Sequence, residues 1–161
     1  MGQIIINEFR RNGMFQSNEY VELLLTEDLT ATQLQSYFVG DADSSTTIKR
    51  SAYQFRNMGD IAPIFKAGTI IAIVGDLSAI PTNDIAYNPV PGGTNGDWNI
   101  QLLINNGAGG TYLNNVLVGT NALGGDFAAS DIAWVDTSSS GITSIDSIAW
   151  PTTTGLGALG D

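Results

Sequence analysis

Short apolar runs separated by clusters of turn-forming residues extend along this chain, and this pattern limits the folds it can adopt. No stretch keeps apolar residues at the helical spacing i, i+3, i+4, i+7 for more than two turns. The runs are instead rich in residues favoured in strands, and Gly, Asn, Asp and Ser fill the segments between them. We expect strands near residues 3–9, 19–26, 34–39, 52–56, 69–75, 99–104, 110–118, 131–135 and 143–149.

This spacing of strands and turns predicts an all-β sandwich of seven to nine strands. A closed barrel fits the same alternation. The 161 residues are enough for one domain with its own core, which we place at residues 1–150. The segment 151–161, PTTTGLGALGD, has no periodicity and is predicted to be a tail or linker.

The chain contains no His and no Cys, which excludes several kinds of chemistry. Ser-His-Asp and Cys-His catalysis and zinc sites all need one of these residues. Two carboxylates alone can hydrolyse a glycoside, but no spacing here nominates such a pair. We therefore predict that the chain is not an enzyme and has no catalytic residues. A chain without cysteines suits any redox compartment, so the localisation stays open.

The charge pattern bears on the partners of the chain. Its net charge is −10, and all six basic residues lie in the first 66 positions, so nucleic acid is not an expected partner. No apolar run reaches the roughly 20 residues of a membrane span, and membrane insertion is not expected. Only 14% of residues are charged, against roughly 25% in ordinary domains. A surface of this kind favours contact with protein partners or copies of the same chain, although a bland extracellular-type domain fits equally well.

Two N-terminal stretches carry a resemblance to a known family. They are IIINEF at 4–9 and NEYVELLL at 18–25, and they resemble the first two strands of the lamin tail domain. Further segments are similar to later strands of that family, in the same order: LQSYFVGD at 34–41, AGTIIAIV at 67–74, LLINNGAGGTYL at 102–113 and SIDSIAW at 144–150. Ser36 stands where the family usually has Gly, and the segment 114–143 is longer than the usual hairpin.

The resemblance implies an immunoglobulin-like β-sandwich of the microbial lamin-tail type. It also implies a non-enzymatic structural or protein-interaction module, such as a subunit or domain of an extracellular, surface-layer, filament or virion-type assembly. Extracellular, cell-surface or virion settings are then favoured over the cytoplasm. We expect the segments 76–98 and 114–143 to make the contacts. Glu8 and Glu22, in the two resembling stretches, are expected to fix neighbouring backbone by accepting N–H bonds.

Calcium is the one cofactor that the sequence suggests, because this ion binds oxygen ligands alone. Asp41 and Asp43 lie two residues apart in GDADSS, and Asp126 lies in GGDFAASD. We nominate these three aspartates as calcium ligands. Asp residues in a Gly- and Ser-rich context also form Asx-turns, which is the structural alternative.

Two aromatic residues in the long Pro- and Gly-rich segment are candidates for ligand or partner contact. Tyr87 and Trp98 could stack on a sugar or insert into a partner surface; alternatively, they form a lid over the edge of the sandwich. The alternative function is therefore a calcium-assisted carbohydrate-binding module.

Overall fold

The computed structural model describes residues 3–10, 20–43, 49, 51–74, 83–90, 96–104, 110–117, 131–140 and 144–150. Within these residues the chain is mostly β, as predicted, with one short helix and one 3-10 turn. In chain order the elements are β1 (Ile4–Arg10), β2 (Tyr20–Leu25), β3 (Leu29–Thr30), α1 (Ala31–Leu34), β4 (Phe38–Asp43), β5 (Ala52–Phe55), a 3-10 turn (Met58–Asp60), β6 (Ile64–Phe65), β7 (Ile70–Val74), β8 (Asn99–Leu103), β9 (Leu113–Leu117), β10 (Asp131–Asp136) and β11 (Asp146–Trp150). The predicted tail at 151–161 lies outside the described residues.

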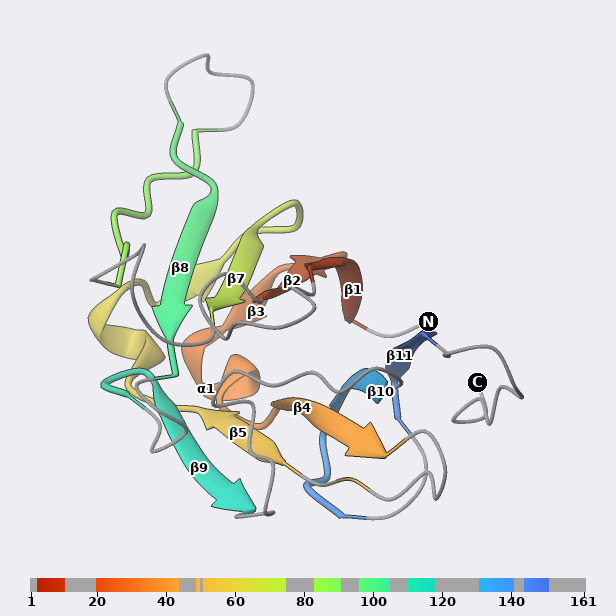
Figure 1. The fold of residues 1–161 in the computed structure, drawn as a ribbon. Helices are drawn as coiled ribbons and strands as arrows, with labels where there is room; N and C mark the ends of the chain where they lie inside the picture. Colours follow the sequence, from red (N-terminus) through yellow and green to blue (C-terminus); the bar gives the residue numbers. More distant parts are fainter. Residues whose placement is uncertain are drawn as a thin grey trace.

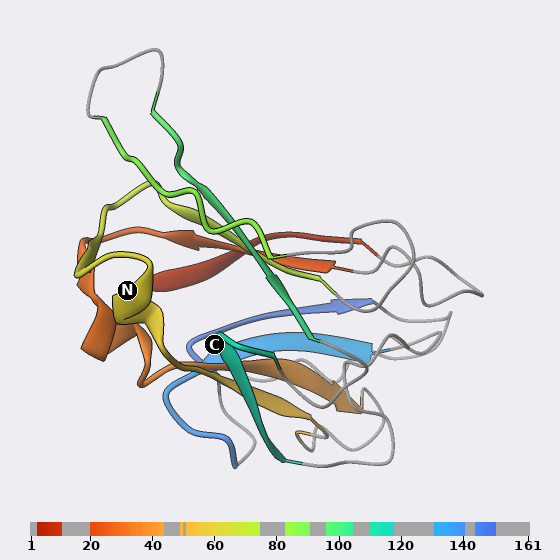
Figure 2. The same ribbon diagram turned by 90° about the vertical axis from the view of Figure 1, so that its left-hand side faces the viewer.

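The strands form two main sheets (Figure 1). The first has the order β1-β2-β7-β8 and the second has the order β11-β10-β4-β5-β9, while β3 and β6 pair separately. Neighbours are antiparallel except for β7 and β8, which are parallel. The two sheets face one another as layers (Figure 2), as expected for a sandwich.

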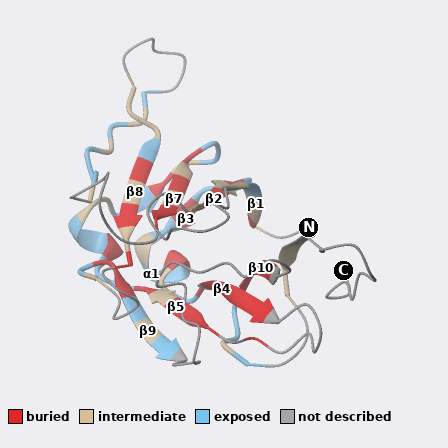
Figure 3. Ribbon diagram, viewed as in Figure 1, coloured by how far each residue is buried: buried red, intermediate tan, exposed pale blue. Residues whose placement is uncertain are grey.

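The main core lies between the layers, because alternate residues of each strand point to the same face. Val21, Leu23 and Leu25 of β2 are buried and alternate with partly exposed residues. The facing sheet contributes Ala133 and Val135 of β10 to the same cluster. Burying one such large aliphatic side chain stabilises the fold by about 1.5–3 kcal/mol. Figure 3 shows the buried segments concentrated in the strands of both layers.

The prediction of a strand at 34–39 is wrong in its first half. Residues 31–34 form the short helix α1, and β4 begins at Phe38. A capping box explains the difference: the Gln33 N–H donates to Thr30 Oγ1 at 3.2 Å, and the Thr30 N–H donates to Gln33 Oε1 at 2.9 Å. These bonds satisfy helix-start donors that a strand would need to pair elsewhere.

Among the described residues, no helix has the length and apolarity to cross a membrane.

A second apolar cluster lies on the outer face of the second sheet. It consists of Ala42, Ala52, Ile132 and Trp134, all fully buried, and we call it the outer cluster. Since Ala133 and Val135 belong to the main core, their neighbours Ile132 and Trp134 point to the opposite face. The second sheet is therefore buried on both faces where β10 meets β4.

Gly40 of β4 is required by the outer cluster. A Cβ at this position would lie 1.9 Å from the Ser51 carbonyl oxygen and 2.6 Å from a ring carbon of Trp134. We expect Gly40→Ala to destabilise the protein by about 1–3 kcal/mol, the usual cost of overpacking, seen as a lower thermal midpoint. The control is Gly59→Ala, because nothing lies within 4 Å of a Cβ there. Equal midpoints for the two variants would contradict this close approach.

Candidate functional site

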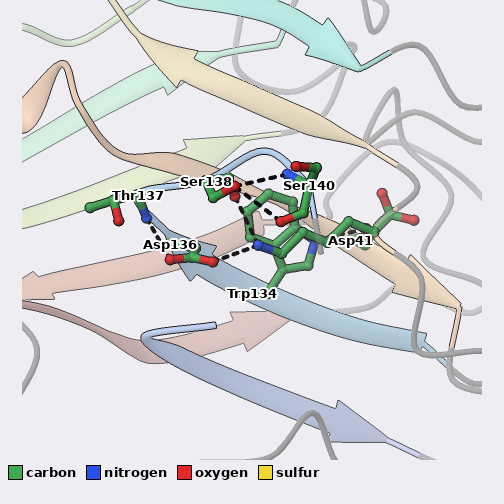
Figure 4. Close-up of polar contacts among 7 residues, drawn as sticks. Asp41, Trp134, Asp136, Thr137, Ser138 and Ser140 are labelled. Atoms are coloured by element: carbon green, nitrogen blue, oxygen red, sulfur yellow. Dashed lines mark hydrogen bonds and ion pairs between the residues drawn. The ribbon is translucent and has the colours of Figure 1, made fainter. Parts of the chain in front are cut away.

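A lysine and an aspartate form a buried ion pair beside the outer cluster. Lys49 Nζ lies 2.6 Å from Asp136 Oδ2, and the two side chains are 1% and 12% exposed. Nζ also donates to the Ser138 carbonyl oxygen at 2.8 Å and lies 4.1 Å from the centre of a Trp134 ring. We call this group of four residues the Lys49 site. Figure 4 shows Trp134, Asp136 and Ser138 gathered at one end of β10.

Strand pairing brings these residues together across a long stretch of chain. Lys49 forms an antiparallel bridge with Ala42 of β4, and Ala42 pairs with Ile132 of β10. Asp136 is the last residue of β10. Its Oδ1 accepts the N–H of Thr137 at 2.7 Å, so both carboxylate oxygens have partners.

The Lys49 site compensates for the cost of burying two charges. Removing an ammonium and a carboxylate from water costs several kcal/mol per ion, and this is recovered only where geometry and hydrogen bonds are good. Here the ammonium has a carboxylate, a carbonyl and an aromatic face as partners. The arrangement can act chemically in two ways: as a fixed structural pair, or as an amine held against a carboxyl group.

Asp41, a predicted calcium ligand, lies in a different environment from the one expected. The predicted strand ends at residue 39, but β4 continues through Asp43 and so includes Asp41. The Asp41 side chain is only 1% exposed and accepts the Ser51 hydroxyl, and its backbone carbonyl accepts the Trp134 indole N–H at 2.8 Å. Burial, followed by the charge of Asp41, raises the pKa of Tyr53. Asp41 thus connects β4 to Ser51 and to Trp134 of β10, within the second sheet.

For the other two predicted calcium ligands, Asp43 and Asp126, the structure describes no side chain. The backbone of Asp43 pairs with that of Asp131, and nothing further is described for its side chain. Asp126 lies outside the described residues. Within the described part of the chain, no three Asp or Glu side chains are grouped so that they could hold a metal ion. The calcium assignment remains a prediction.

Tyr87 anchors the segment 83–90 to the sandwich. Its hydroxyl accepts the Lys66 N–H at 2.8 Å and lies 2.8 Å from Thr69 Oγ1, and its ring centre is 5.3 Å from that of Phe65. The segment runs antiparallel along β8 through the bridges Asp84–Gln101 and Asn88–Asp97. It therefore covers the edge of β8 that faces away from β7.

Trp98, the second predicted contact residue, is half-buried just before β8. A Cβ on Gly68 would lie 3.9 Å from the Trp98 ring, and a Cβ on Gly96 would lie 2.8 Å from its indole nitrogen. The ring thus lies beside two glycines. For Tyr87 and Trp98 alike, contact with a ligand or partner remains a prediction.

A groove of about 390 Å³ lies on the outer face of the first sheet. Its lining residues are Glu22, Ile70, Ala72, Asp84, Asn99, Ile100 and Gln101. Two carboxylates and two amides thus surround an apolar floor. Among the described residues, Glu22 accepts from the Asn7 side-chain amide, where a backbone N–H was expected. Glu8 accepts the Tyr20 hydroxyl at 2.5 Å. Tyr87 and Trp98 are not among the lining residues.

Sequence reasoning missed both the groove and the Lys49 site. Lys49 and Asp136 are 87 positions apart, and nothing local to either residue indicates the other. To place Lys49 beside Asp136, one must know that β4 pairs with β10. A pattern of strands in the sequence does not give the order of those strands in a sheet. Comparison with protein families, curated proteins and solved structures gave no match to this chain.

Proposed function

We propose that the chain is a non-enzymatic structural or protein-interaction module that belongs to an extracellular, surface-layer, filament or virion-type assembly. The observation that carries this proposal is the use of the carboxylates. Six described aspartates accept hydrogen bonds that fix the fold: Asp28, Asp41, Asp84, Asp97, Asp136 and Asp146.

Asp146 and Asp28 show how these bonds hold the molecule together. Asp146 of β11 accepts the Ile6 N–H at 2.7 Å, where a bulge interrupts β1, and so links the two sheets. Asp28 accepts Lys66 Nζ at 2.8 Å and the Ala67 N–H at 2.9 Å. The Lys66 hydrogen bond, followed by that of Ala67, lowers the pKa of Asp28. A carboxyl group that serves as a general acid needs a pKa shifted in the opposite direction, so this lowering supports a structural role.

The finer assignment, an immunoglobulin-like sandwich of the microbial lamin-tail type, is part of the same proposal. It is supported by the position of the resembling stretches on paired strands. Residues of IIINEF lie in β1 and those of NEYVELLL lie in β2, and Ile4 pairs with Leu25. AGTIIAIV contributes to β7, which is the next strand of the same sheet.

Self-association tests the proposed function. A chain with 14% charged residues has a weakly hydrated surface that is easily covered by another copy. We expect light scattering coupled to size-exclusion chromatography to give a mass that is a multiple of the chain mass and rises with concentration. A monomer at every concentration, in the presence and absence of salt, would contradict the homo-oligomeric form of the proposal.

The groove favours a second candidate, a carbohydrate-binding module. Carboxylates and amides around an apolar floor suit a ligand with many hydroxyl groups. Titration with soluble oligosaccharides, with calcium and with a chelator, tests both the ligand and the ion. We expect Asn99→Ala to weaken binding about tenfold, roughly the value of one hydrogen bond. The exposed Asn114 of β9 provides the control Asn114→Ala. Equal affinity of both variants for the oligosaccharide would exclude the groove as its binding site.

A further inference from the structure

The Lys49 site holds a buried primary amine against a carboxyl group that is itself only slightly exposed. Nζ of Lys49 is 2.6 Å from Oδ2 of Asp136, and the Lys49 side chain is only 1% exposed. These two groups are the components of an amide bond. We propose that Lys49 and Asp136 become joined by an amide that forms within the folded chain. This inference does not depend on the function proposed above.

The surroundings restrict where the amine can go. The Ser138 carbonyl accepts from Nζ at 2.8 Å, and the Trp134 ring lies 4.1 Å from it. The ammonium is therefore fixed between an acceptor, an aromatic face and the carboxyl group. Groups held in this way react as if one of them were present at about 10⁵–10⁸ M, which offsets much of the barrier to an otherwise slow condensation.

The two oxygens of Asp136 have different partners, which assigns them different roles. Oδ2 contacts the amine, whereas Oδ1 accepts the Thr137 N–H at 2.7 Å (Figure 4). Oδ2 is the oxygen that leaves and Oδ1 is the oxygen that stays. The Thr137 N–H stabilises the negative charge that develops on Oδ1 when the carbonyl carbon becomes tetrahedral.

The reaction balances without a further reactant. A proton passes from Nζ to Oδ2, which converts the ion pair into an amine and a carboxylic acid and removes both charges from an apolar site. The Nζ lone pair then attacks Cγ of Asp136. The bond from Cγ to Oδ2 breaks, and Oδ2 leaves as water with the transferred proton and a second proton from Nζ. The products are one secondary amide and one water molecule.

The product connects two parts of the chain that are 87 positions apart. It joins the end of β10 to the residue that bridges β4, and the buried outer cluster lies alongside. The low exposure of both side chains to water protects the amide from hydrolysis. A covalent link of this kind prevents β4 and β10 from separating completely when the rest of the fold is lost.

Mass spectrometry of the purified full chain, denatured before measurement, tests the proposal. We expect the wild-type mass to be lower than the sequence mass by one water molecule. After proteolysis, the peptide that contains Lys49 should be recovered joined to the peptide that contains Asp136. Lys49→Arg keeps the positive charge but has no primary amine, so its mass should equal its sequence mass. Asp136→Asn should form the same amide with loss of ammonia.

Three results would overturn the proposal. The first is a wild-type chain that keeps its sequence mass after prolonged incubation in the folded state. The second is loss of water without a joined peptide, and the third is the same loss in Lys49→Arg; both would assign the change to cyclisation elsewhere in the chain. The joined peptide is sought in the wild-type protein, so it decides the question even where a variant fails to fold.

Discussion

Replacement of Trp134 by alanine is expected to lower the free energy of unfolding by about 3–5 kcal/mol, the range for a large buried aromatic residue. Trp134 is fully buried and is the largest member of the outer cluster. Its indole N–H donates to the Asp41 carbonyl, and its ring lies against the Lys49 ammonium. The variant therefore loses apolar packing, a buried hydrogen bond and a cation–π contact together. Equilibrium unfolding in urea measures the change.

Trp98→Ala is the matched control for this prediction. The Trp98 side chain is half-buried and lies outside both buried clusters. Its removal exposes less new surface and leaves a smaller cavity, so we expect a clearly smaller loss of stability. Similar losses for the two variants would show that the outer face of the second sheet is not covered as described.

Replacement of Lys49 by methionine is the second prediction with a large effect. The variant leaves the Asp136 carboxylate at a site where its side chain is only 12% exposed. Loss of one partner from a buried ion pair costs about 3–5 kcal/mol, and the cost is greater where the wild-type pair has become an amide. The double variant Lys49→Met/Asp136→Leu removes both polar groups, so we expect it to recover part of the loss. Urea unfolding of both variants gives the comparison.

Lys66→Met controls for the loss of a lysine as such. Lys66 forms an ion pair with Asp28 at 2.8 Å, but its side chain is 43% exposed and that of Asp28 is 52% exposed. Exposed pairs contribute about 0–1 kcal/mol because water and salt screen them, so this variant should unfold close to wild type. If Lys49→Met and Lys66→Met lowered the free energy of unfolding by equally small amounts, Lys49 would not be buried in the way the structure describes.

The all-β class could be predicted from the sequence because alternation is a local signal. Val21 to Leu25 alternates between buried and partly exposed positions, as a half-buried strand must. The first half of the strand expected at 34–39 was wrong for a local reason that was visible in the sequence. Thr30 and Gln33 have the spacing of a capping box, which starts the helix α1. The helix therefore lies ahead of the β-favouring residues further along the chain, which begin β4.

The candidate site could be predicted only in part, because it depends on contacts between distant residues. From its Gly- and Ser-rich context, Asp41 was nominated as a calcium ligand, with an Asx-turn as the structural alternative. The structure instead places it in β4, where its carboxylate meets the Ser51 hydroxyl. Lys49 and Asp136 had no mutual signal, since they meet only when β4 pairs with β10. The order of strands in a sheet is determined by the whole fold, and neither the sequence around Lys49 nor the sequence around Asp136 reveals it.

The covered outer face of the second sheet is the central claim of this account, and hydrogen exchange at the Trp134 indole tests it most directly. NMR resolves indole N–H signals separately, and Trp134→Phe assigns this one. We predict exchange as slow as that of the most protected backbone amides, because the N–H is buried and bonded to the Asp41 carbonyl. Exchange as fast as that of the half-exposed Trp98 indole would contradict the claim.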